Sequence, residues 1–253
     1  MKNIVLKEKL KKNELTIGSW ITIGHPAIPE ILATAGFDWL TIDIEHNLID
    51  SSMIRTLIGT IQAENIAALV RVSKNDDVII KHAMDAGADG IIVPMVNSKA
   101  DAIKAVEFVK YPPIGKRGVG LSRAQKYGTA FDEYKDWLAN FAVVIAQIEH
   151  IDAINNIEEI IKTPGIDGVI VGPYDLSASL GFPGDYNRAE VMSAIQFMEA
   201  ACAKNNFPMG YHVVPPKIEL VNEKIAEGYK FIAFSTDFLF LGETARLLMN
   251  VGK

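Results

Sequence analysis

Short runs of β-branched and other apolar residues alternate with longer amphipathic segments along the whole chain. Within the runs the apolar residues are consecutive rather than alternating, which is typical of parallel strands covered on both faces. Strands are therefore predicted at residues 17–23, 39–44, 67–72, 90–93, 143–148, 168–171, 209–213 and 231–234. The intervening segments have helical periodicity at residues 29–35, 51–64, 76–86, 99–109, 153–161, 189–204, 216–227 and 236–249.

The junctions between helices and strands repeat one arrangement, in which a helix ends, a glycine follows and a strand begins. It occurs in AGFDWLTID, AGADGIIVP, PGIDGVIVG and EGYKFIAFS. Eight β–α units in 253 residues predict an α/β protein, a single (β/α)8 TIM barrel with parallel strands. We expect residues 1–253 to form this one domain, with residues 1–15 as an N-terminal helical cap. The absence of a glycine-rich phosphate-binding motif disfavours a doubly wound nucleotide-binding sheet.

Composition and charge narrow the class of protein. Hydrophobic residues make up 49% of the chain and charged residues 22%, which excludes a disordered chain. The net charge, 25 − 31 = −6, disfavours a nucleic-acid partner. Cys202 is the single cysteine, which excludes an internal disulfide. Because no apolar run has the length of a signal peptide or a membrane span, we expect a cytoplasmic protein without a membrane partner.

Two carboxylates at the predicted carboxyl ends of neighbouring strands indicate a metal site. In such a barrel the active site lies at that end of the strands. Glu149 and Asp175 follow adjacent strands, and two carboxylates without thiolates suit Mg²⁺ or Mn²⁺. Asp175 could instead cap a helix, whereas Glu149 would otherwise end an apolar run on an unpaired charge.

The other candidates follow the second, third and fifth strands. His46 is a candidate general base, although it could be a structural histidine, and Asp43 and Glu45 could orient it or hold metal-bound water. Arg71 ends an apolar run and could hold a carboxylate or a developing oxyanion. Gln147 points to the same side of its strand as Glu149, where it could contact substrate or form a buried hydrogen bond to the backbone.

Two loops complete the candidate site. The stretch from Lys110 to Tyr127 is long and irregular, which is typical of a functional loop, and Arg123 on it could bind an acidic or hydroxylated aldehyde. The turn from Gly172 through Tyr174 to Asp175 enters a helix and could offer N–H groups to a carboxylate.

Motifs in order along the chain resemble the HpcH/HpaI family of class II, metal-dependent aldolases. They are GFDWLTIDIEH, RVSKND, DAGADGIIVPMV, YPPIGKRGVG, QIE and GVIVGPYDLSASLG. The resemblance implies that Glu149 and Asp175 are the metal ligands and that His46 is the base. It also implies that Arg71 stabilises the enolate and that Asp85 raises the basicity of the histidine.

The same resemblance implies substrate contacts from Gln147 and from the backbone of Tyr174. It further implies a homo-hexamer, with C-terminal helices exchanged between neighbours. The activity that it implies is reversible cleavage of a 4-hydroxy-2-oxo acid, of the 2-dehydro-3-deoxy sugar acid type, into pyruvate and an aldehyde through a metal-bound enolate. Family members act on 2-oxo-3-deoxy sugar acids and 4-hydroxy-2-oxo-heptanedioate.

Three alternative functions remain at this stage. A lyase of the citramalyl- or malyl-CoA type and an oxaloacetate decarboxylase would both use a metal-bound enolate. A silent barrel that serves for binding would be expected to lack at least one of Glu149, Asp175, His46 and Arg71, and all four are present. A class I aldolase is disfavoured, because no lysine lies within a predicted strand to form a Schiff base.

Overall fold

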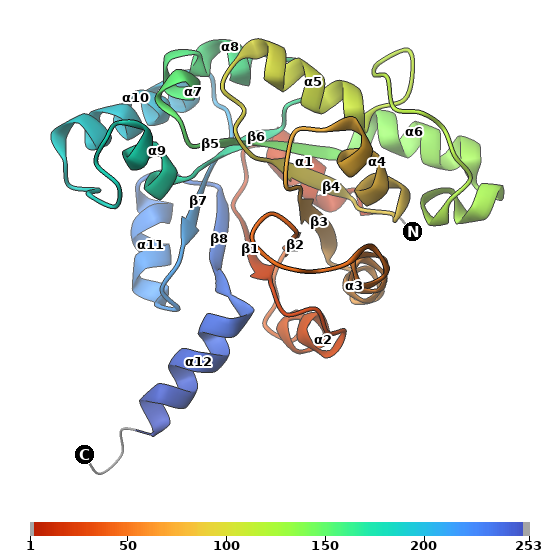
Figure 1. Cartoon of the computed structure of the whole chain (residues 1–253), viewed down its shortest axis with the longest axis horizontal. Helices are drawn as coiled ribbons and strands as arrows, with labels where there is room; N and C mark the ends of the chain where they lie inside the picture. Colours follow the sequence, from red (N-terminus) through yellow and green to blue (C-terminus); the bar gives the residue numbers. More distant parts are fainter. Residues whose placement is uncertain (1–2, 250–253) are drawn as a thin grey trace.

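Eight parallel strands close into a barrel in the computed structural model, which describes residues 3–249 (Figure 1). The strands lie around the barrel in chain order, and β8 pairs with β1. They are β1 Thr16–Ile21, β2 Trp39–Asp43, β3 Ala67–Arg71, β4 Gly90–Val93, β5 Val143–Ile148, β6 Gly168–Val171, β7 Met209–Val213 and β8 Phe231–Thr236. The predicted (β/α)8 TIM barrel is confirmed. Residues 1–2 and 250–253, at the ends of the range expected to form one domain, lie outside the described part.

Helices surround the barrel, most of them where the periodicity predicted. They are α1 Val5–Lys11, α2 Ala27–Ala33, α3 Ser51–Ala63, α4 Asp77–Asp85, α5 Lys99–Val109, η1 Arg123–Gly128, α6 Phe131–Phe141, α7 Ile151–Asn155, α8 Ile157–Ile161, α9 Pro173–Ser179, α10 Ala189–Lys204, α11 Ile218–Ala226 and α12 Asp237–Leu248. The helix expected at 153–161 is two helices, α7 and α8, which meet at Asn156. Helix α6 was not predicted, although Tyr134, Trp137 and Leu138 form its buried face at helical spacing.

Two separate apolar clusters hold the barrel together. The larger one fills the space between the strands and the surrounding helices. The smaller one fills the inside of the barrel and includes Leu6 and Leu10 of α1, together with interior residues such as Leu69 and Ile145. Helix α1 therefore covers the interior residues from one end.

Two stacked aromatic rings close the interior of the barrel near the start of the strands. The rings of Trp39 and Phe231 lie 4.2 Å apart between centroids, with 7° between their planes. Gly18 makes room for them, because a Cβ atom at that position would lie 2.0 Å from the Trp39 ring. This end of the barrel is packed with side chains and offers no passage.

The interior positions change from apolar to polar toward the carboxyl ends of the strands. On β5 the apolar Val143 and Ile145 belong to the interior cluster, and the next position of the same alternation is Gln147. The same change leads to Arg71 on β3 and to His212 on β7. Because an interior polar group needs partners, this layer is where a ligand site is expected.

Helix α12 projects away from the barrel at the carboxyl end of the chain (Figure 1). Leu241, Leu247 and Leu248 on this helix are exposed. Its first residue, Asp237, is buried and accepts hydrogen bonds from the backbone N–H groups of Thr22 and Ile23, each at 2.8 Å. Within residues 3–249, no helix is both long and apolar enough to span a bilayer.

Candidate active site

A cavity of about 290 Å³ opens at the carboxyl end of the barrel. It is lined by Glu45, His46, Met95, Glu149, His150, Asp175 and Ser179. Four residues singled out from the sequence, Glu45, His46, Glu149 and Asp175, therefore meet at one cavity. They come from the loops and strand ends after β2, β5 and β6, as expected for this fold.

Glu149 is buried and held on both carboxylate oxygens. Oε1 accepts a hydrogen bond from the backbone N–H of Met95 at 2.8 Å, and Oε2 accepts one from Nε2 of Gln147. Burial raises the pKa of Glu149, and the nearby negative charge of Asp175 adds to the effect. A positive charge beside these two carboxylates would offset both the burial of the Glu149 charge and its repulsion from Asp175.

Asp175 is exposed, and its carboxylate is available to a ligand. It is the third residue of α9, yet no hydrogen bond or ion pair joins its side chain to another described residue, so the alternative of a helix cap is not observed in this part of the chain. Gly172 lies beside Glu149: a Cβ atom there would be 3.1 Å from Oε2 of Glu149. The small residue leaves the space around the two carboxylates open.

This pair of carboxylates fits a divalent cation. No group of three or more His, Cys, Asp and Glu side chains gathers into a metal site in the described residues. A hard cation such as Mg²⁺ is nevertheless commonly held by one or two carboxylates, with water and substrate at its other positions. Glu149 and Asp175 are the residues that would hold it.

Arg71 is fixed by two acidic side chains at the end of the neighbouring strand. Its Nε and Nη2 atoms donate to Oδ1 and Oδ2 of Asp43 at 2.9 and 2.8 Å, and Nε also lies 3.3 Å from Oε2 of Glu45. Burial alone would raise the pKa of Asp43, but the hydrogen bonds and charge of Arg71 outweigh it and hold that pKa below its usual range. These contacts occupy one edge of the guanidinium and leave Nη1 without a hydrogen-bond partner among the described residues.

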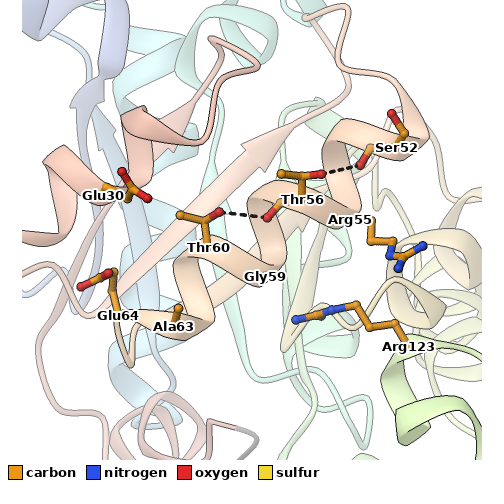
Figure 2. Close-up of a pocket in the computed structure, with 9 residues that line it drawn as sticks. All are labelled: Glu30, Ser52, Arg55, Thr56, Gly59, Thr60, Ala63, Glu64 and Arg123. Carbon is orange, nitrogen blue, oxygen red and sulfur yellow. Dashed lines mark hydrogen bonds between the residues drawn. The ribbon is translucent and has the colours of Figure 1, made fainter.

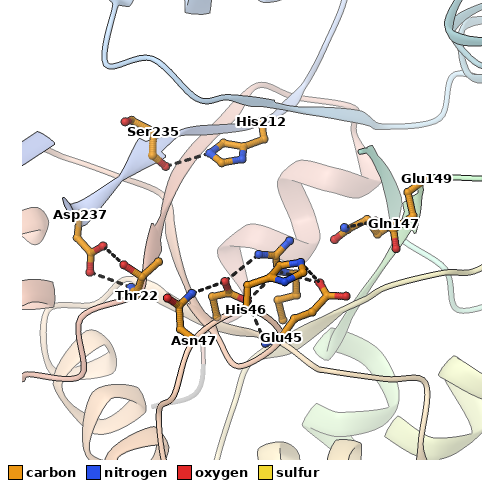
Figure 3. A network of polar contacts seen from close by, with 11 residues as sticks. Thr22, Glu45, His46, Asn47, Gln147, Glu149, His212, Ser235 and Asp237 are labelled. Carbon is orange, nitrogen blue, oxygen red and sulfur yellow. Dashed lines mark hydrogen bonds and ion pairs between the residues drawn. The ribbon is translucent and has the colours of Figure 1, made fainter. Parts of the chain in front are cut away.

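The two side chains that follow β2 lie together at the cavity (Figure 3). Nε2 of His46 lies 3.6 Å from Oε2 of Glu45, and the His46 side chain is 66% exposed. Burial raises the pKa of Glu45 to about 7 against the opposing charge of Arg71, and the charge of Glu149 adds to the rise. An exposed imidazole beside an acid with a pKa near neutrality can exchange protons with a ligand in the cavity.

Gln147 points into the barrel, as the alternation along β5 predicted. Its Nε2 donates to Glu149, and its buried Oε1 has no partner among the described residues. The alternative of a hydrogen bond to the backbone is therefore not observed. The free amide oxygen can accept a hydrogen bond from a ligand hydroxyl or a water molecule.

Two residues expected at the site, Asp85 and Arg123, lie elsewhere in the described chain. Asp85 ends α4, which runs back toward the start of β4; its Oδ1 lies 3.9 Å from Nη1 of Arg117, and it has no hydrogen bond or ion pair with His46. Arg123 donates to the carbonyl of Ala86 at 2.9 Å. Tyr174, which was expected to act through its backbone, is 56% exposed, and its side chain does not line the cavity.

Arg123 lines a second and larger cavity, of about 570 Å³, beside α3 (Figure 2). The lining residues are Glu30, Ser52, Arg55, Thr56, Gly59, Thr60, Ala63, Glu64 and Arg123. Figure 2 shows that most of them come from one face of α3, in the outer layer of helices. This position is away from Glu149 and Asp175, so Arg123 does not reach the candidate site within this chain.

Sequence reasoning missed three residues that shape the site. Met95 orients Glu149 through its backbone, and Asn47 donates to Oδ2 of Asp43 at 2.6 Å. The ring of Trp20 lies 4.3 Å from the guanidinium carbon of Arg71. Trp20 could have been found from its interior position on β1, but a backbone N–H leaves no trace in residue type.

Comparison with known proteins identifies the family. A profile described as HpcH/HpaI aldolase/citrate lyase matches residues 16–241. The chain belongs to this family. Both reactions in its description break a carbon–carbon bond, and this member is accordingly a carbon–carbon lyase.

Two relatives and one solved structure are similar over nearly the whole chain. A 5-keto-4-deoxy-D-glucarate aldolase of Klebsiella pneumoniae is 35% identical over 95% of this chain and 94% of its own length. A 2-dehydro-3,6-dideoxy-6-sulfogluconate aldolase of Pseudomonas putida is 34% identical over 95% and 93%. An HpcH/HpaI aldolase/citrate lyase family protein of Burkholderia cenocepacia superposes with a TM-score of 0.91, 32% identity and 98% of both chains covered.

Proposed function

We propose that this chain is a class II aldolase that reversibly cleaves a 4-hydroxy-2-oxo acid of the 2-dehydro-3-deoxy sugar acid type into pyruvate and an aldehyde. The observation that carries the proposal is the meeting of Glu149 and Asp175 with His46 at one cavity, beside a fixed Arg71. The names of the two relatives, both aldolases of deoxy sugar acids, support this substrate class.

Each side chain has a distinct task in this reaction. Glu149 and Asp175 would hold Mg²⁺ or Mn²⁺, which supplies a Lewis acid that polarises the 2-oxo group. Nη1 of Arg71 donates to the oxygen on which negative charge develops as the carbon–carbon bond breaks. His46 accepts the proton of the 4-hydroxyl group during cleavage and returns it during condensation.

Gln147 and the turn at the start of α9 complete the binding of the 2-oxo acid. The N–H groups of Tyr174 and Asp175 have no backbone partner among the described residues, and they can donate to its carboxylate. Gln147 keeps Glu149 in place through Nε2 and offers Oε1 to the ligand.

The experiment that tests this function is exchange of the methyl protons of pyruvate in D₂O. We expect exchange with added Mg²⁺ or Mn²⁺, and its loss with EDTA. Glu149→Gln and Asp175→Asn should abolish both the exchange and tight Mn²⁺ binding, measured by the EPR signal of free Mn²⁺. Glu159→Gln, in a helix on the outside of the barrel, is the matched control. Absence of exchange with either metal in the unmodified protein would contradict the proposal and favour a CoA-ester lyase or a silent barrel.

We further propose a homo-hexamer, as the resemblance implies. The exposed leucines of α12 are consistent with contacts to another copy. Because Asp85 lies toward the amino ends of the strands of its own barrel, an action of Asp85 on His46 would require a neighbouring copy. Light scattering of the intact protein measures the oligomeric state, and a monomer would contradict both points.

A further inference from the structure

One polar side chain in the interior of the barrel has no task in the proposed mechanism. His212 lies on β7, in the same polar layer as Arg71 and Gln147. Its ring centroid is 5.5 Å from that of Trp20. The guanidinium carbon of Arg71 lies 4.3 Å from the same Trp20 ring. Trp20 thus lies close to both His212 and Arg71 near the carboxyl ends of the strands.

The backbone around Ser235 fixes which nitrogen of His212 carries the proton. Nε2 of His212 lies 3.3 Å from the carbonyl oxygen of Ser235, and a carbonyl can only accept, so Nε2 carries the hydrogen. Ser235 has a φ of 52°, in the left-handed region that non-glycine residues seldom adopt. It lies where the pairing of β1 with β8 shifts register, between Gly18 and Trp20. The bulge and the left-handed residue together direct this carbonyl at the imidazole.

The remaining nitrogen, Nδ1, is then a hydrogen-bond acceptor without a described donor. Burial lowers the pKa of His212 to about 4, and the charge of Arg71 acts in the same direction, so the ring is neutral at physiological pH. A neutral acceptor cannot bind the carboxylate or the enolate oxygen of the 2-oxo acid, which need donors. It can bind the hydrogen of a hydroxyl group.

The position of His212 indicates which part of the ligand it meets. Figure 3 shows His212 and Ser235 on one side of the polar network and Glu149 and Gln147 on the other. In the proposed function the 2-oxo acid is bound at Glu149, and a second reactant on the opposite side of this network would meet His212 on β7. We propose that His212 is a specificity-determining residue, whose Nδ1 selects an aldehyde that carries a hydroxyl group over one that lacks it. This inference rests on the proposed function.

The test compares two aldehydes that differ in hydroxylation, glyceraldehyde and propanal, in condensation with pyruvate. The quantity measured is the ratio of their kcat/KM values, since differences in intrinsic electrophilicity cancel when the ratio is compared between variants. His212→Leu should lower this ratio about tenfold, the value of one neutral hydrogen bond. His212→Asn, whose Oδ1 can replace Nδ1, should restore part of it. His25→Leu, an exposed histidine after β1, is the control and should keep the ratio of the unmodified protein.

Each other outcome has a defined meaning. A ratio within twofold of that of the unmodified protein in His212→Leu overturns the proposal. The proposal is also overturned if His212→Leu slows pyruvate deuterium exchange as much as it slows condensation with both aldehydes. That result would place His212 in enolate formation. If His212→Leu does not fold, ¹⁵N NMR of the unmodified protein decides: Nδ1 should shift on addition of glyceraldehyde and stay unchanged with propanal. Absence of exchange in the unmodified protein would instead contradict the aldolase function itself.

Discussion

The backbone N–H of Met95 donates a hydrogen bond of 2.8 Å to Oε1 of Glu149, from a residue whose φ is 52°. A side chain in this left-handed region is strained by about 1–3 kcal/mol, and such strain is frequent at functional sites. Here the strained conformation turns the N–H toward the carboxylate. The strained backbone of Met95 therefore helps to orient Glu149, a proposed metal ligand.

The strain at Met95 should be visible in stability. A β-branched side chain suffers most at positive φ, whereas glycine adopts that conformation freely. We expect the free energy of unfolding of Met95→Val to be about 1–2 kcal/mol lower than that of Met95→Gly. Urea denaturation of the two variants measures the difference. Equal stabilities would show that the left-handed conformation is not maintained in solution.

Gly172 predicts a second effect on Glu149. A methyl group at this position would lie 3.0 Å from Cβ and 3.1 Å from Oε2 of Glu149, closer than most real contacts. Gly172→Ala should therefore displace the carboxylate and weaken Mn²⁺ binding about tenfold or more while the barrel still folds, because φ at this position is −102° and strains no residue. Gly118→Ala, where a methyl group meets open space, is the control. Unchanged affinity in Gly172→Ala would separate this contact from metal binding.

The two hydrogen bonds from Arg71 to Asp43 predict a specific role for the guanidinium. Lysine cannot make the two parallel hydrogen bonds to Asp43 and also present a third donor. We expect Arg71→Lys to lower kcat for cleavage about 100- to 1,000-fold, the usual cost of one lost donor to a developing oxyanion. Mn²⁺ affinity should change far less than kcat. A kcat within threefold of the unmodified protein would exclude Arg71 from charge stabilisation.

Lys110 predicts the dependence of stability on pH. Its buried Nζ donates to the carbonyls of Leu138, Ala139 and Ala142, and burial lowers its pKa to about 7, with the charge of Lys7 adding to the effect. In the unfolded chain its pKa is about 10.4, so between pH 7 and 10 the unfolded state binds more protons. Stability should therefore rise with pH in this window, by at most about 1.4 kcal/mol per pH unit, and be independent of this group below pH 7.

Lys110→Met should remove that rise. Denaturation at pH 7.0, 8.0 and 9.0 compares the slopes of the variant and the unmodified protein. Lys116→Met, at a lysine whose side chain is 70% exposed, is the matched control and should retain the slope. A slope that persists in Lys110→Met would assign it to another group.

The sequence predicted the parts of the site that depend on strand alternation. Gln147 lies on β5 and Glu149 follows its last residue, two positions further on, so their shared direction follows from the period of a strand. Their meeting with Asp175 follows from the adjacency of β5 and β6. These are local or nearest-neighbour properties, which residue spacing determines.

The sequence could not predict contacts that depend on how loops and helices return to the barrel. Arg123 lies on a loop of suitable length and chemistry, but its guanidinium is held by Gln62 and Ala86 beside α3. Asp85 was assigned by resemblance alone, and the direction of α4 separates it from His46 in a single chain. The acceptor role of His212 depends on the backbone conformation of Ser235, which no residue pattern reveals.

The stacked rings of Trp39 and Phe231 have a kinetic consequence for the proposed reaction. They close the interior below the site, and α1 covers it further, so reactants enter and leave through the same opening. In the proposed reaction, the product bound nearer this opening must therefore leave first, so the two products of cleavage would be released in a fixed order.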